Sequence, residues 1–167
     1  LQLHRRAFGD KQGSDVSELT RALLVDETAE PILSIICIES GMIIGHILFT
    51  RVEINGAEAA PLASILAPLA VLPDYQNKGV GGQLIKTGFD ELQKSGIGLV
   101  FVLGHPGYYP RHGFSPAGVL GFEPPYPVPS EHADAWMVHE LLPGSMQGVA
   151  GTVQCCVALN SPEHWRE

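Results

Sequence analysis

Residues 65–92 read ILAPLAVLPDYQNKGVGGQLIKTGFDEL, and this stretch decides how the rest of the chain is interpreted. The apolar run Ile65–Leu72 is long enough for one buried strand, and the turn at Pro73–Asp74 ends it. A short polar loop with three glycines follows. Apolar residues then recur at helical spacing from Leu84 to Leu92. The stretch therefore predicts a strand, a glycine loop and a helix in direct succession.

The glycine loop, residues 76–82 (QNKGVGG), has the features of an anion site. The first N–H groups of a helix have no partner within the helix, and the helix dipole adds partial positive charge there. Glycines let a phosphate approach the backbone because no Cβ stands in the way. We therefore expect this loop to hold a cofactor that carries a diphosphate.

Two familiar phosphate-binding motifs do not fit the loop. No Lys-Ser or Lys-Thr pair follows the glycines, as the phosphate loop of nucleoside triphosphatases requires. The dinucleotide fingerprint also fails, because three properly spaced glycines and a later acidic ribose ligand are missing. The cofactor must therefore belong to another class.

The composition limits the possible partners. A chain of 167 residues with 45% hydrophobic residues is expected to form one globular domain. Ten basic against eighteen acidic residues give a formal net charge of −8. Nucleic acids need a basic face, so we expect no nucleic-acid partner.

Cysteine usage and hydropathy bear on the compartment. Cys37, Cys155 and Cys156 have no metal or redox spacing, and an odd count without a signal peptide fits the reducing cytoplasm. No apolar run is long enough to span a membrane, so no membrane partner is expected. The chain opens inside a helix-like segment without Met, which predicts that its native beginning is missing.

The periodicity of the chain predicts a mixed α/β (α+β) architecture. Pairs of apolar runs separated by Ser40-Gly41 and Asn55-Gly56 indicate antiparallel strands in series. We expect helices at 1–8, 15–25 (with Asp15 and Glu18 as a capping pair) and 81–94, a helical turn at 143–147, and strands at 32–39, 42–54, 62–72, 99–103, 133–141 and 151–158.

The strand ending at Val71 and the strand ending at Leu103 are joined by the helix at 81–94. Such a crossover is right-handed and makes the two strands parallel neighbours. The ligand crevice of this unit lies beyond the carboxyl ends of its strands. We therefore expect a largely antiparallel sheet with one parallel pair at its centre and the site at Val71 and Leu103.

Two motifs in this setting resemble those of the GNAT acetyltransferase superfamily. Gln76-x-x-Gly79-x-Gly81 matches its acyl-CoA loop, and residues 108–114 (YYPRHGF) resemble the aromatic-Tyr-x-x-x-Gly-Phe signature that follows the fifth strand. The resemblance implies a single GNAT domain over residues 1–167, with a twisted, mostly antiparallel sheet whose central parallel pair is splayed and flanked by helices. Family members begin with a strand that this chain lacks.

The resemblance also implies how acetyl-CoA, or coenzyme A, is bound as a cosubstrate. The backbone of one strand end pairs with the pantetheine arm, the loop amides hold the diphosphate, and Lys78 adds a point charge unless it is only a solvated loop lysine. The cofactor-binding residues expected on this basis are Leu69, Ala70, Val71, Gln76, Asn77, Lys78, Gly79, Val80, Gly81, Gly82 and Tyr108.

Tyr109 is the expected general acid. In the family, the tyrosine at this motif position faces the cofactor sulfur and protonates the departing thiolate. A phenol and a thiol have unperturbed pKa values of about 10 and about 8.5, so the transfer is chemically reasonable. The alternative is that Tyr109 only packs on the cofactor, and Tyr108 is expected to be a packing residue.

The general base that deprotonates the acceptor amine is less defined. His105 follows the strand ending at Leu103 and can titrate near neutrality, so it is our candidate. A structural or cofactor-contacting role is the alternative. Glu58 is a weaker candidate. His112 is expected to face the core or the surface, and His46 to be structural or to face the substrate. Deprotonation through water would need no dedicated base.

The sequence thus predicts an acetyl-CoA-dependent N-acetyltransferase that moves an acetyl group to a primary amine in a ternary complex. No metal-ligand cluster or nucleophilic triad is found in the sequence, which fits direct attack of the amine on the thioester. A backbone amide in residues 69–71 is expected to stabilise the oxyanion. The acceptor is a small-molecule or protein amine, the Pro-rich residues 123–130 are expected to form part of its site, and a homodimer is possible. A non-catalytic acyl-CoA-binding module is the alternative.

Overall fold

An eight-stranded mixed sheet forms the centre of the computed structural model, which describes residues 1–166. Its strands are β1 (Leu33–Glu39), β2 (Met42–Asn55), β3 (Ala63–Val71), β4 (Leu99–Leu103), β5 (Ser115–Pro116), β6 (Phe122–Glu123), β7 (Trp136–Glu140) and β8 (Gly151–Cys155). The α-helices are α1 (Gln2–Phe8), α2 (Asp10–Val25) and α3 (Val80–Lys94).

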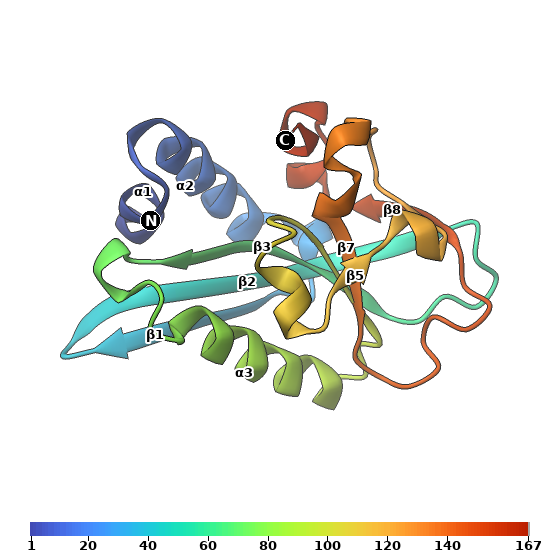
Figure 1. The fold of residues 1–167 in the computed structure, drawn as a ribbon, viewed down its shortest axis with the longest axis horizontal. Helices are drawn as coiled ribbons and strands as arrows, with labels where there is room; N and C mark the ends of the chain where they lie inside the picture. Colours follow the sequence, from blue (N-terminus) through green and yellow to red (C-terminus); the bar gives the residue numbers. More distant parts are fainter. Residues whose placement is uncertain (167) are drawn as a thin grey trace.

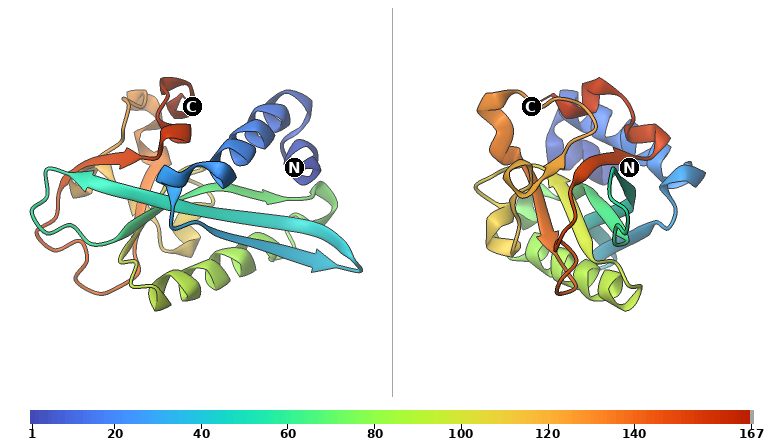
Figure 2. Two further views of the ribbon diagram at one scale, coloured as in Figure 1. Left: turned by 180° about the vertical axis from the view of Figure 1, so that it is seen from behind. Right: turned by 90° about the vertical axis from the view of Figure 1, so that its right-hand side faces the viewer.

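The strands follow the order β5-β7-β4-β3-β2-β8-β6, and β1 pairs with β2 beside β8. Helices α1 and α2 cover one face of this sheet and α3 covers the other (Figure 1). The views from behind and from the side show the same layers, with the C-terminal segment on the face of α1 and α2 (Figure 2). The predicted parallel neighbours, β3 and β4, lie at the centre of the sheet.

The β1–β2 hairpin turns at the predicted dipeptide. Ser40 has φ 51° and Gly41 has φ 75°, so both central residues of the turn are left-handed. This is the turn geometry that matches the right-handed twist of the flanking strands. The strand pairs β1–β2 and β2–β3 are antiparallel, as the sequence predicts.

Side chains alternate between two cores along the central strands. On β4, Leu99 and Phe101 face the core under α2, while Val100 and Val102 face the core under α3. Phe101 stacks on Trp136 with 5.2 Å between ring centroids, which anchors β7 to β4 on the α2 side. The central strands are therefore buried on both faces, and this explains why β4 is apolar throughout.

Helix α3 packs closely on the sheet through Gly88. A Cβ at this position would lie 2.4 Å from Cε2 of Phe49, a residue of β2 that is fully buried. Leu84, Ile85 and Leu92 on the same face are also buried. Burial of such a side chain contributes roughly 1.5–3 kcal/mol, so the helix is held by its apolar face.

The predicted start of α2 at Asp15 is wrong. The helix begins at Asp10, and Gly9 is its N-cap with φ 82°. Asp15 therefore lies inside the helix and forms no capping pair with Glu18. The misleading signal was the spacing of Asp15 and Glu18, which imitates a capping pair. Inside the helix, Gly13 allows a close approach to α1, since a Cβ there would lie 2.5 Å from the carbonyl oxygen of Arg5.

Four further expectations on the C-terminal half need correction. The sheet contains a second parallel pair, because β6 runs parallel to β8. Residues 143–147 form hydrogen-bonded turns and no helix, and residues 133–135 belong to a 3-10 helix that precedes β7. Strand β8 ends at Cys155, before a 3-10 turn at 157–159. In these segments short apolar runs were extended beyond the residues that have a pairing partner.

Candidate active site

Strands β3 and β4 separate at the centre of the sheet. Their parallel pairing ends at Ile65 and Phe101, although β3 continues beside β2 to Val71 and β4 continues beside β7 to Leu103. The carboxyl-terminal part of β3 thus has a paired edge toward β2 and an open edge toward β4. This opening lies at the position that the order of the strands predicts for a ligand.

A β-bulge explains the separation. The β2–β3 register shifts between Phe49↔Leu66 and Ile47↔Leu69, so Ala67 and Pro68 together oppose Leu48. A bulge bends the strand and increases its twist. Pro68 also has no N–H group with which to continue a ladder, and prolines inside sheets are confined to edges and bulges. Pro68 thus marks where β3 turns away from β4.

The register determines which backbone groups face the opening. The N–H of Leu72 donates to the carbonyl of Ile44 at 2.9 Å, and Ala70 is opposite His46. Hydrogen-bonded pairs alternate along an antiparallel ladder, so the backbone groups of Ala70 point to β2. Those of Leu69 and Val71 point to the side from which β4 has departed. Of the three strand residues singled out in the sequence, Leu69 therefore has a free N–H and a free carbonyl, and Val71 has a free N–H, because its carbonyl accepts from Gln76.

The glycine loop joins this edge to α3. Gly79 is the N-cap of the helix with φ 83°, a left-handed conformation that suits glycine, and Asn77 has φ 60°. The first helical backbone bond runs from the N–H of Gln83 to the carbonyl of Gly79 at 3.0 Å. The amides of Val80, Gly81 and Gly82 therefore precede it and have no acceptor within the helix.

Two side chains of the loop make specific contacts. Nε2 of Gln76 donates to the carbonyl oxygen of Val71 at 3.0 Å, which ties the loop to the end of β3. Nζ of Lys78 lies 5.7 Å from the ring centroid of Tyr75, within the range of a cation–π contact. The ammonium group of Lys78 is thus directed toward Tyr75 in this structure.

The two tyrosines of the aromatic motif occupy different places. A Cβ at Gly104, which follows β4, would lie 2.4 Å from Cε2 of Tyr109, so this ring packs directly on the end of β4. A Cβ at Gly81 would lie 2.5 Å from the hydroxyl oxygen of Tyr108, so that hydroxyl touches the first turn of α3. Tyr109 thus belongs to the end of β4, and Tyr108 reaches across to α3.

The environments of these phenols differ accordingly. Burial strongly raises the pKa of Tyr109, and the neighbouring Tyr108 adds to the effect. Burial also raises the pKa of Tyr108, but the guanidinium of Arg111 opposes this shift. No hydrogen bond of either hydroxyl is found within the described part of the chain, whereas Tyr126 is bonded to Asn160. Both phenols are therefore protonated at neutral pH and have a donor to offer.

The histidines considered in the sequence analysis lie in different parts of the fold. His105 is exposed, and its carbonyl accepts the N–H groups of Tyr108 and Tyr109 at 3.1 and 3.2 Å. His112 is half-buried, lies beside Tyr108 and has a pKa lowered by burial and by Arg111. His46 is buried in the sheet under α1, away from the surface. Glu58 is exposed in the loop before β3.

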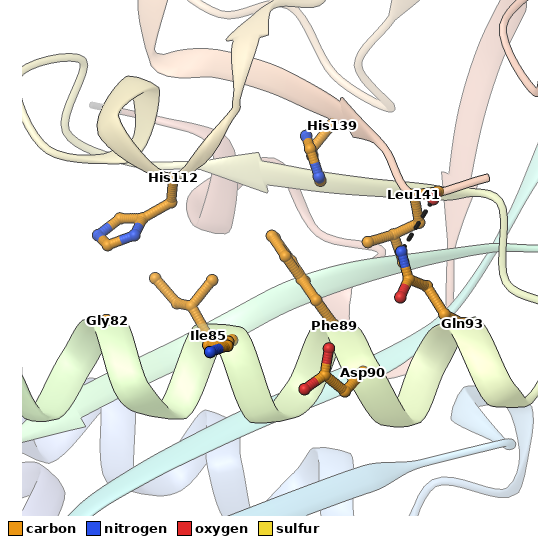
Figure 3. A pocket seen from close by; sticks show the side chains of 9 residues that line it. Gly82, Ile85, Phe89, Asp90, Gln93, His112, His139 and Leu141 are labelled. Atoms are coloured by element: carbon orange, nitrogen blue, oxygen red, sulfur yellow. Dashed lines mark hydrogen bonds between the residues drawn. The ribbon is translucent and has the colours of Figure 1, made fainter. Parts of the chain in front are cut away.

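A shallow hollow of about 260 Å³ lies between α3 and the segments that carry His112, His139 and Leu141. Figure 3 shows Ile85 and Phe89 of α3 pointing toward the segments that carry His112 and His139. Phe89 stacks on His139 with 4.8 Å between ring centroids. Gly82 is the member of the glycine loop that lines this hollow, and Tyr109 and His105 are not among its lining residues. The hollow is therefore adjacent to the strand opening and separate from it.

Residues 1–166 contain no group of three or more His, Cys, Asp or Glu side chains arranged to bind a metal ion. Within the same residues, none of the helices combines the length and the apolar character that crossing a bilayer requires.

Comparison with known proteins identifies the family. Residues 1–117 match the acetyltransferase (GNAT) domain family. The chain is 48% identical over 155 residues to the uncharacterized N-acetyltransferase YjhQ of Escherichia coli K12. The matched region covers 92% of this chain and 83% of YjhQ. The chain belongs to the GNAT acetyltransferase family. The fold class and the family that the sequence predicted are thereby confirmed.

Solved structures of GNAT proteins agree with this assignment. The chain resembles a GNAT family N-acetyltransferase (YhbS) from Escherichia coli in complex with CoA, with a TM-score of 0.83, 28% identity, and coverage of 96% of this chain and 84% of that one. It also resembles a GNAT family acetyltransferase from Brucella melitensis in complex with acetyl-CoA, with a TM-score of 0.71, 29% identity, and coverage of 95% and 88%.

Proposed function

We propose that this GNAT protein is an acetyl-CoA-dependent N-acetyltransferase that transfers an acetyl group to a primary amine in a ternary complex. The acceptor is a small-molecule or protein amine. Two relatives support the reaction class by their names, and two similar structures are described as complexes with CoA or acetyl-CoA. The assignment of acetyl-CoA as the donor rests on that similarity and on the fit of this chain's own residues.

The observation that carries the proposal is the open edge of β3 that leads to the start of α3. Leu69 offers its N–H and carbonyl and Val71 its N–H along this edge, where an extended amide-bearing arm can pair as an added strand. The edge ends at the unpaired amides of the first turn of α3, which suit a diphosphate. An extended arm that ends in a diphosphate is the outline of CoA. Acetyl-CoA would supply an acyl group activated as a thioester.

Tyr109 is proposed as the proton donor to the thiolate of CoA. Its ring packs at the end of β4, beside the opening, and burial keeps its hydroxyl protonated. A raised pKa makes a phenol a weaker acid, but the same apolar surroundings also raise the proton affinity of a thiolate. Proton transfer between the two groups therefore remains feasible. Tyr108, whose pKa is also raised by burial against the opposing charge of Arg111, is the second phenol within the motif.

His105 is proposed as the base that takes a proton from the acceptor ammonium, so that the neutral amine can attack the thioester. It follows β4 directly, it is exposed, and its backbone fixes the turn that carries both tyrosines. An imidazole in such a place can exchange its proton with water after each turnover. Deprotonation through water alone is the alternative, and it predicts that His105→Gln retains the rate of the wild type.

The decisive experiment separates cofactor binding from turnover. We expect wild-type protein to bind CoA in calorimetry and to acetylate at least one member of a panel of amines, followed by mass spectrometry. Tyr109→Phe should retain CoA affinity and lose about 10²-fold in kcat, a typical contribution of a general acid. Tyr75→Phe, which removes a hydroxyl from the turn before the loop, is the matched control and should retain both.

Two outcomes would overturn parts of this proposal. Unchanged turnover in Tyr109→Phe would exclude Tyr109 as the acid. Tight CoA binding without turnover across small amines, polyamines and peptide amines would favour a non-catalytic acyl-CoA-binding module.

A further inference from the structure

We infer that Tyr108 and Arg111 form a second wall of the diphosphate site and recognise the phosphates of CoA together with the first turn of α3. This inference rests on the proposed function. It assigns to a side-chain pair outside the glycine loop the charge recognition that the sequence suggests for Lys78.

The first argument is the place of the Tyr108 hydroxyl. The position of a Cβ at Gly81 lies 2.5 Å from this oxygen and 3.6 Å from Cδ2 of Leu69. The hydroxyl thus stands where the open edge of β3 and the first turn of α3 meet. A chain of ligand atoms that runs from the edge to the helix amides must pass beside it. Because Tyr108 is protonated and its hydroxyl has no partner in the described chain, it can donate to a ligand oxygen there.

The second argument is that Arg111 is held in place on the outer side of Tyr108. Its Cζ lies 5.3 Å from the centroid of the Tyr108 ring, and its Nη2 donates to the carbonyl of Gly107 at 3.1 Å. One N–H group is used in this bond, so the other guanidinium donors remain available to an anion. A guanidinium that is already oriented loses less side-chain freedom when it binds a phosphate than a free lysine does.

His112 completes the contact between the aromatic turn and α3. Its ring centroid lies 4.9 Å from that of Tyr108, and its Cε1 lies 3.1 Å from the position of a Cβ at Gly82. Two side chains of the motif at 108–114 thus pack against one side of Gly81 and Gly82. In this loop, glycine makes room for Tyr108 and His112 as well as for a phosphate.

The third argument is charge. The chain has a formal net charge of −8, so a polyanionic ligand needs local cations to approach. Lys78 is the basic residue of the loop, and its ammonium is directed to Tyr75. Arg111 lies over the tyrosine that touches Gly81. A planar guanidinium also matches phosphate oxygens in a two-point contact, which an ammonium does not provide.

Calorimetric titration with CoA, 3′-dephospho-CoA and pantetheine tests this assignment. We expect Arg111→Gln to bind CoA about tenfold more weakly, to lose part of its discrimination between CoA and pantetheine, and to show a weaker salt dependence of CoA binding. Tyr108→Phe should weaken CoA severalfold. Lys94→Gln, at the far end of α3, removes a surface charge of the same sign and should bind as the wild type does.

The outcomes separate this inference from the proposed function. A larger loss in Lys78→Gln than in Arg111→Gln, or an equal loss for pantetheine and CoA in Arg111→Gln, would overturn the inference while acetyl transfer is retained. If the wild type does not bind CoA, the proposed function itself fails.

A second readout needs no ligand. Gly81→Ala should lower the melting temperature of the wild type, because the new methyl group meets the hydroxyl of Tyr108. In a Tyr108→Phe background the ring carbon Cζ is 3.6 Å from that methyl position, an ordinary contact. The same Gly81→Ala change should then leave the melting temperature unchanged or raise it, since alanine favours a helix. Equal effects in both backgrounds would show that Tyr108 does not rest on Gly81.

Discussion

His4 of α1 and His46 of β2 share a buried hydrogen bond, with 2.9 Å between Nε2 of His4 and Nδ1 of His46. His46 also bonds the hydroxyl of Ser34 on β1 through Nε2 at 2.8 Å. The two imidazoles are 4% and 5% exposed. A positive charge on either ring would therefore lack hydration, and burial disfavours protonation of both. This chain of three side chains fixes α1 to the sheet beside Ala70, the residue opposite His46 on β3.

The pair predicts acid sensitivity between pH 6.5 and about 4. Burial, with the neighbouring His4, lowers the pKa of His46 from 6.5 to about 4. The unfolded chain therefore binds a proton that the folded chain refuses, and the free energy of unfolding falls as the pH drops through this window. The full effect is on the order of 3 kcal/mol. Urea unfolding followed by tryptophan fluorescence at pH 8, 6 and 5 measures it.

His46→Gln is the variant that tests this cause. It should lower stability at pH 8, because His4 and Ser34 lose a buried partner, yet its stability should fall less between pH 8 and pH 5. His132→Gln, at an exposed position, should keep the pH dependence of the wild type. If the His46→Gln profile is as steep as the wild-type profile, other groups cause the acid sensitivity.

Gly88 predicts a stability effect of the opposite sign to helix propensity. Alanine in place of glycine gains about 1 kcal/mol in an exposed helix. At Gly88, however, the new methyl group would meet the buried ring of Phe49, and overpacking of this kind costs roughly 1–3 kcal/mol. We expect Gly88→Ala to be destabilised in urea unfolding.

Two comparisons check the explanation of Gly88. Gly118→Ala has no atom within 4 Å of the new methyl group and should be close to neutral. In a Phe49→Leu background the cost of Gly88→Ala should shrink, because the smaller side chain leaves room. A Gly88→Ala protein as stable as the wild type would mean that α3 shifts freely on the sheet.

The order of elements in this fold was predictable because local signals and tertiary packing agree along most of the chain. The apolar run at 99–103 is β4 to the residue, and Ser40-Gly41 forms the expected turn. The predicted start of α2 was five residues late because Asp15 and Glu18 imitate a capping pair, whereas Gly13 inside the helix serves the close approach of Arg5 on α1. No local pattern reports such a contact between elements.

The motifs that form the site were predictable from the sequence, but the contacts between them were not. The spacing of Gln76, Gly79 and Gly81 located the loop, but only the structure relates Gly81 to Tyr108 and Gln76 to the carbonyl of Val71. Pro68 was a usable signal for the bulge, since a proline inside a central strand needs one. The role of Arg111 had no signal of its own, because an arginine inside a motif does not reveal what lies under it.

Replacement of Gln76 is expected to weaken CoA binding through loss of loop geometry. Its amide donates to the carbonyl of Val71 and so holds the loop against β3. Gln76→Ala frees the loop, which must then be ordered when a ligand binds, so we expect CoA affinity to fall severalfold while the melting temperature changes little. Gln83→Ala, an exposed position in the first turn of α3, is the control and should bind CoA as the wild type does. Equal affinity in both variants would show that the loop is held by its backbone alone.

The register of β3 predicts that amide hydrogen exchange rates alternate along the end of this strand. The N–H of Ala70 faces β2 and should exchange slowly with or without ligand, while those of Leu69 and Val71 face the opening and should exchange fast in the free protein. Addition of CoA should slow Leu69 and Val71 and leave Ala70 unchanged, because only the open edge gains partners. Residue-resolved NMR exchange measures all three, and Ile36 on the edge strand β1 is a reference that should not respond. If CoA binds and the rates at Leu69 and Val71 remain those of the free protein, the pantetheine arm does not pair with this edge and the ligand must lie elsewhere.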